Sequence, residues 1–139
     1  MDAIFARHHR LAEAVRVCVS HWEKGGAMAF NAQVPEQRAD ALTVIRCEGG
    51  VDPDAIRFTA REQFDVAVGG GLGAVAGKVF RIGHMGDLND PMILGALCGV
   101  EATFNRLGVP YESGVADAIA YLSSTAAAPA REPDARRVV

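Results

Sequence analysis

One arginine stands inside a short apolar segment of the chain. Arg81 lies between Phe80 and Ile82 in the run KVFRIG, residues 78–83. A buried guanidinium must find an anion, because an unpaired buried charge is strongly destabilising. Arg81 could therefore form an internal ion pair with an Asp or Glu, or face solvent at a sheet edge. Alternatively, it could bind a substrate carboxylate through two parallel hydrogen bonds. Spacing alone favours the first, purely structural interpretation.

The histidines offer weaker chemistry. His84 follows Arg81 closely and Asp87 comes shortly after, so the two could form an acid–base pair. No nucleophile with a matching context accompanies them, and a structural role for His84 at the end of a strand is favoured. His8 and His9 are adjacent on an expected helix, where neighbouring side chains point about 100° apart. They do not chelate one metal together, and no metal site is predicted.

A glycine-rich segment at residues 69–77 invites two nucleotide-binding interpretations. A P-loop requires a glycine where Leu72 stands and a hydroxyl after Lys78, where the chain has Val79. A GxGxxA pattern can be read from residue 71 to 76, but that motif must open a helix and this one runs into KVFRIG. Both interpretations fail. The segment is expected to be a turn in which glycine tolerates unusual backbone angles or a close approach.

Composition narrows the class of protein. The chain has 139 residues, a net charge of −3 and 50% hydrophobic residues, which fits one packed domain. No basic stripe indicates nucleic acid, and no apolar run is long enough for a membrane span. Three cysteines without a CxxC pair are expected to be small buried hydrophobes in a reducing compartment. No signal peptide is recognised, so a cytoplasmic location is expected.

Periodicity places the elements around Arg81. Apolar residues recur at helical spacing over residues 4–22, and strands are expected at 27–30, 41–47, 66–68 and 78–83. In the last strand, Phe80 and Ile82 share one face, and Val79 and Arg81 the other.

Two further helices and a short terminal one complete the pattern. Asp52-Pro53 is expected to open a helix that buries Ile56, Ala60 and Phe64, and Asp90-Pro91 to open one that ends at Gly108 and buries Ile93, Leu97, Val100, Phe104 and Leu107. A short helix is expected at 114–123. Together these elements predict an α+β fold in two layers, a small and largely antiparallel sheet packed with helices.

Several blocks resemble one enzyme family. The run GKVFRIGHMGDLNDPMILGALCGVEATF, residues 77–104, resembles the closing segment of serine–glyoxylate and alanine–glyoxylate aminotransferases, class V enzymes of fold type I that use pyridoxal phosphate (PLP). FARHHRLA at 5–12 resembles the family's inter-domain helix. EGGVD at 48–52 and GGGLG at 69–73 resemble two of its turns. The resemblance extends over residues 3–123.

The resemblance implies a role for the R-I-G motif. Arg81 occupies the position that binds the α-carboxylate of the amino or keto acid, which reverses the preference from spacing. Gly83 would leave room for substrate beside the guanidinium, and the glycine loop would border the active-site mouth. No catalytic, cofactor-binding or metal-binding residue is expected on this chain. The family's PLP lysine lies in a large domain, and Lys24 and Lys78 do not match its context.

The chain is thus expected to be the small domain of such an enzyme, truncated at its start. The domains expected are an inter-domain helix at 1–24, the small domain at 25–125 and a disordered tail at 126–139. Its partners would be the missing PLP-binding domain, a small amino or keto acid and a second subunit in a homodimer. Alone, it is expected neither to bind PLP nor to transaminate. Two alternatives stay open, a non-catalytic interaction module and a standalone binder of small acids.

Overall fold

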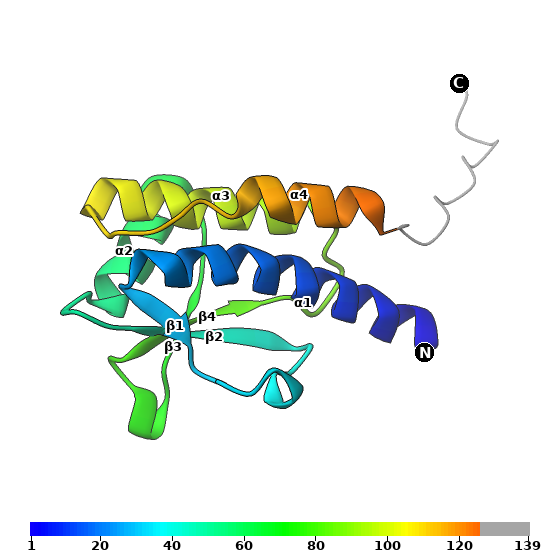
Figure 1. Cartoon of the computed structure of the whole chain (residues 1–139), viewed down its shortest axis with the longest axis horizontal. Coiled ribbons are helices and arrows are strands. Elements are labelled where there is room, and N and C mark those ends of the chain that lie inside the picture. Colours follow the sequence, from blue (N-terminus) through cyan, green and yellow to red (C-terminus); the bar gives the residue numbers. More distant parts are fainter. Residues whose placement is uncertain (126–139) are drawn as a thin grey trace.

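The computed structural model describes residues 1–125, and the tail expected at 126–139 lies outside the described residues. Helices pack on a four-stranded sheet in which every pair is antiparallel and the strand order is β1-β2-β4-β3. Figure 1 shows α3 and α4 above α1, with the sheet beneath them. The predicted α+β fold, a small antiparallel sheet packed with helices, is confirmed.

The main elements follow the predicted order closely. The helices and strands are α1 (Asp2–Trp22), β1 (Met28–Phe30), β2 (Leu42–Cys47), α2 (Pro53–Phe64), β3 (Gly69–Gly70), β4 (Val79–Gly83), α3 (Asp90–Leu107) and α4 (Val115–Ser124). Short 3-10 turns lie at Glu23–Gly25, Pro35–Gln37 and Gly73–Val75. Among the described residues, no helix combines the length and apolar character needed to span a bilayer.

Local capping explains where α2 and α3 begin and where α3 ends. The Asp52 carboxylate accepts a hydrogen bond from the Asp54 backbone N–H at 2.8 Å, which confirms it as the cap of α2. The cap predicted at Asp90 is wrong. Asn89 caps α3 by accepting from the Met92 N–H at 3.0 Å, and Asp90 is the first helical residue. Gly108 ends α3 with φ 67°, in the left-handed region expected of it.

The register of the sheet sets one row of residues side by side. Val44 on β2 pairs with Arg81 on β4, and Arg81 pairs with Gly69 on β3. Directly opposed residues share a face, so all three lie on the face away from buried Phe80. The strand predicted at 66–68 is wrong: strand pairing is confined to Gly69–Gly70, while the side chain of Val66 packs against α3 at Gly99.

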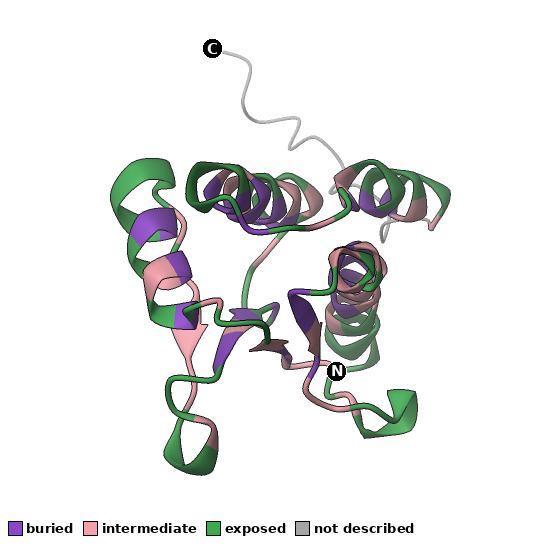
Figure 2. Cartoon of the chain, turned by 60° about the vertical axis from the view of Figure 1, so that its left-hand side comes forward, coloured by how far each residue is buried: buried purple, intermediate pink, exposed green. Residues whose placement is uncertain are grey.

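The core fills the space between sheet and helices. Trp22, Phe80 and Phe104 are fully buried, and Figure 2 shows buried positions on the facing sides of helices and strands. Burial of Phe64 and Leu107 was predicted wrongly. They are 36% and 40% exposed, because each is the last residue of its helix.

The three cysteines do not share one environment. Cys18 is fully buried and Cys47 is partly buried, as expected of small apolar side chains. Burial of Cys98 was predicted wrongly, and it is exposed. It follows buried Leu97 on α3, and one step along a helix turns a side chain by about 100°.

Candidate functional site

The guanidinium of Arg81 has no anionic partner in the described part of the chain. Arg81 is partly buried in the middle of β4, and none of the ion pairs among residues 1–125 involves it. Its Nε atom is buried without a hydrogen-bond partner. The side chain lies against Gly69 of the edge strand β3, where the glycine-rich segment begins. Within residues 1–125, Arg81 is therefore a charged fork whose hydrogen-bonding capacity is unused.

Gly83 lies two residues further along β4, on the same face as Arg81. It is exposed, and a Cβ atom placed on it would meet no atom within 4 Å. Its φ also lies outside the left-handed region, so the described chain itself does not require glycine there. The space beside Arg81 is open at this position.

A second arginine on this face of the sheet is already neutralised. Arg46 on β2 pairs with Val79 and so lies on the same face as Arg81. Its Nη2 donates to the Glu48 carboxylate at 3.0 Å and its Nε donates to the same oxygen at 3.2 Å. The two arginines share a sheet face, but Arg81 alone of this pair is available to an external anion.

His84 and Asp87 do not form the acid–base pair that their spacing allowed. The Asp87 side chain is fully exposed and pairs with Arg7 at 3.4 Å. His84 is fully buried, with its Nδ1 2.8 Å from the Asp40 carbonyl and its Nε2 3.0 Å from the Thr43 hydroxyl. Because a carbonyl only accepts, Nδ1 carries the proton and Nε2 accepts from Thr43. Burial lowers the pKa of His84. The neutral ring is bonded to Asp40 and Thr43 and so fixes the chain at the end of β4.

The lysines do not fit the covalent attachment of a PLP cofactor. The Lys24 ammonium is 54% exposed and pairs with Glu112 at 3.0 Å on the surface. Lys78 is exposed in the turn just before β4. Neither stands in an enclosed site where a carbonyl compound could be held dry beside it. Among residues 1–125, no group of three His, Cys, Asp or Glu side chains could hold a metal ion.

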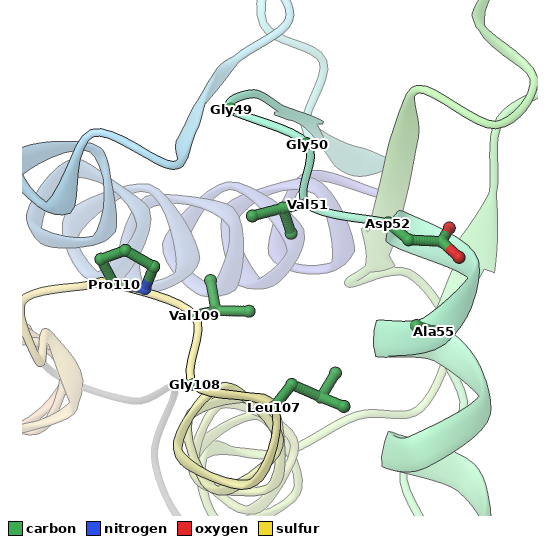
Figure 3. Close-up of a pocket in the computed structure, with 9 residues that line it drawn as sticks. All are labelled: Gly49, Gly50, Val51, Asp52, Ala55, Leu107, Gly108, Val109 and Pro110. Atoms are coloured by element: carbon green, nitrogen blue, oxygen red, sulfur yellow. The ribbon is translucent and has the colours of Figure 1, made fainter.

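A shallow pocket lies between the β2–α2 turn and the end of α3 (Figure 3). Its lining consists of apolar side chains, backbone and one carboxylate: Gly49, Gly50, Val51, Asp52, Ala55, Leu107, Gly108, Val109 and Pro110. The Asp52 carboxylate is occupied in capping α2. This pocket offers no cation to an organic acid, and Arg81 does not line it.

The sequence analysis missed a buried carboxylate on α3. Glu101 is 8% exposed and accepts hydrogen bonds from the Trp22 indole at 2.9 Å, the Gly114 backbone at 2.8 Å and the Ser113 hydroxyl at 2.6 Å. Its position four residues after Leu97 and three before Phe104 places it on the apolar stripe of the helix. This spacing could have predicted from the sequence that the Glu101 carboxylate is buried. The partners come from α1 and the α3–α4 connection, so Glu101 has a structural role.

Among the known proteins whose sequences are similar to this chain are several aminotransferases that use glyoxylate. The chain is 42% identical over 130 residues to an L-aspartate–glyoxylate aminotransferase of Paracoccus denitrificans, an alignment that covers 92% of the chain and 32% of the relative. It is 41% identical over 124 residues to a serine–glyoxylate aminotransferase of Methylorubrum extorquens, covering 88% and 30%. A serine–glyoxylate aminotransferase of Arabidopsis thaliana is 37% identical over 124 residues. None of the family models searched matches the chain.

Solved structures agree with these sequences. The pyridoxamine–pyruvate aminotransferase of Mesorhizobium loti superposes with a TM-score of 0.81 and 29% identity, covering 90% of this chain and 32% of that one. The ureidoglycine–glyoxylate aminotransferase of Bacillus subtilis shares the fold with a TM-score of 0.77 at 22% identity, over 86% of this chain and 30% of that one. The chain thus spans about a third of the length of the relatives that it matches.

Proposed function

The chain is homologous, over about 30% of their length, to class V aminotransferases of the serine–glyoxylate and alanine–glyoxylate group, and from this premise we propose that it supplies the substrate-carboxylate site of such an enzyme. The substrates proposed are small amino and keto acids, with glyoxylate as the amino acceptor. Serine, alanine or aspartate would be the donor. This proposal concerns the protein of which the chain forms one part.

One observation carries the proposal: the guanidinium of Arg81 is unpaired among the described residues and lies beside open space at Gly83. An arginine fork matches the two oxygens of a carboxylate. Arg46 on the same face does not compete, because Glu48 already neutralises it. A small organic acid would therefore be held at Arg81 with its remaining atoms passing over Gly83.

The role of Arg81 in this proposal is to bind and orient the substrate. Two parallel hydrogen bonds would fix the plane of the carboxylate and thereby the direction of the α-carbon. Holding a reactant in one orientation lowers the activation free energy, on the order of several kcal/mol. The neutral His84 would keep the end of β4 in place through its bonds to Asp40 and Thr43.

The cofactor would be held by the part of the enzyme outside this chain. PLP supplies the electron sink that amino-group transfer requires. Neither Lys24 nor Lys78 lies in surroundings that fit it, so the lysine and the phosphate site are assigned to the large domain. We therefore expect the isolated chain to leave added PLP unbound and to show no transaminase activity.

The test is a spliced enzyme. Residues 1–125 replace the aligned part of the Methylorubrum extorquens serine–glyoxylate aminotransferase, which is 41% identical to them. The spliced enzyme should bind PLP, as followed by its absorbance, and should transfer an amino group from serine to glyoxylate. A folded, PLP-loaded spliced enzyme without this activity would overturn the proposal.

A further inference from the structure

Gly69 lies directly against the side chain of Arg81. The two residues are cross-strand partners on β3 and β4. A Cβ atom added to Gly69 would stand 3.3 Å from Nε of Arg81, 3.4 Å from its Nη2 and 3.5 Å from its Cβ. The side chain of Arg81 therefore runs over the bare backbone of the edge strand. This contact also covers Nε, which is buried without a partner.

Two other glycines of this segment serve a different purpose. Gly73 and Gly77 have φ values of 57° and 70°, and an added Cβ would meet nothing within 4 Å at either. They are required by the backbone angles of the turn. The φ angle of Gly69 lies outside the left-handed region, so the backbone conformation does not require glycine there. The contact with Arg81 is what restricts a side chain at this position.

The neighbouring glycine faces the opposite side of the strand. A Cβ on Gly70 would come within 2.6 Å of Nη1 of Arg57, which projects from α2. Arg57 is already held by Asp54 at 2.7 Å. The two-residue strand β3 thus lies between two arginines, one on each face, and Arg81 alone of the two is unpaired within residues 1–125. Gly70 is therefore a matched control for Gly69.

We propose that Gly69 is a positioning residue that sets where the Arg81 guanidinium presents its fork to a carboxylate. This inference rests on the proposed function and deepens it. The absence of a side chain lets Nε and Nη2 lie close to the β3 backbone. A methyl group there displaces both atoms by a few tenths of an ångström, and a branched side chain displaces them further. Because hydrogen bonds weaken steeply when their geometry is distorted, this displacement weakens the hydrogen bonds between Arg81 and the bound carboxylate.

The experiment follows the arginine Nε–Hε signals of the full 139-residue chain by NMR while glyoxylate is added. Gly69→Ala should shift the free-state Arg81 signal, speed its exchange with water and weaken glyoxylate binding roughly three- to tenfold, as expected for one impaired charge-assisted hydrogen bond. Gly69→Val should weaken it further. Gly70→Ala should move the Arg57 signal and leave glyoxylate binding unchanged.

A second background separates this inference from the function that it rests on. With Arg81→Gln present, Gly69→Ala should cause no additional loss, because the group that Gly69 positions is gone. If Arg81→Gln abolishes the glyoxylate response while Gly69→Ala and Gly69→Val bind like the unaltered chain, Gly69 is not a positioning residue. If glyoxylate leaves the Arg81 signal of the unaltered chain unmoved, the carboxylate site itself is wrong.

Discussion

The indole Nε1–H of Trp22 donates a hydrogen bond to the Glu101 carboxylate at 2.9 Å, joining α1 to α3 inside the core. The same carboxylate accepts from Ser113 and from the backbone of Gly114, and the Cys18 thiol lies 3.6 Å away. An ionised carboxylate is buried at tolerable cost only when such donors surround it. This network fixes the helix layer over the sheet that carries Arg81.

Replacing that carboxylate by an amide should destabilise the domain. In Glu101→Gln one acceptor oxygen becomes an NH2 group facing donors, so we expect the free energy of unfolding to fall by about 1–3 kcal/mol. Urea denaturation measures it. Glu62→Gln is the control, because that side chain is 55% exposed and lies 4.0 Å from Arg61. Equal stability of the two variants would show that the network contributes little.

The cysteines should react with a thiol reagent at very different rates. Cys98 is exposed, whereas burial raises the pKa of Cys47 to about 12 and raises that of Cys18 further. Only the thiolate is reactive. We expect one fast thiol in the folded chain and three after denaturation, measured with Ellman's reagent. Cys98→Ser should remove the fast phase, and a fast phase that survives this substitution would contradict the structure.

Stability should depend on the protonation of His84. Burial lowers its pKa from the ordinary 6.5, so the unfolded chain takes up the proton at a higher pH than the folded one. The contribution of neutral His84 to the free energy of unfolding is therefore fully present above pH 6.5. It declines as the pH falls below 6.5, by at most about 1.4 kcal/mol per pH unit. Urea denaturation across this range should show less decline in His84→Asn. A His84 NMR titration midpoint at or above 6.5 would contradict the assignment.

Gly83 should matter for binding and not for folding. A methyl group there meets no atom within 4 Å, so Gly83→Ala should leave the free energy of unfolding within about 0.5 kcal/mol or raise it slightly. The same methyl group would occupy the space beside Arg81 and should weaken glyoxylate binding to the full chain, measured by NMR titration. Unchanged binding would mean that substrate does not pass over this position.

Local signals predicted much of the fold. The cap at Asp52 and the left-handed glycine at Gly108 are short-range features that need no knowledge of the rest of the chain. The apolar, β-branched runs likewise located β2 and β4, and alternation along β4 placed Arg81 opposite the core face. The family resemblance then supplied the chemical interpretation that spacing alone did not favour.

What the sequence did not predict depends on distant partners. The strand at Gly69–Gly70 consists of glycine, which is depleted in strands, and it is defined by its pairing with β4, with an arginine side chain on each of its two faces. The hydrogen bond between Trp22 and Glu101 joins residues 79 positions apart. The sequence also could not predict that Arg81 lacks a partner among residues 1–125, because this depends on where every nearby carboxylate lies in the folded chain.

The spliced enzyme with Arg81→Gln provides the most direct measurement. Its KM for glyoxylate should rise at least about tenfold relative to the parent spliced enzyme, because both hydrogen bonds to the carboxylate are lost. Arg46→Gln, on the same sheet face but already paired with Glu48, should leave KM unchanged. An Arg81→Gln enzyme with the parent's KM for glyoxylate would contradict the account.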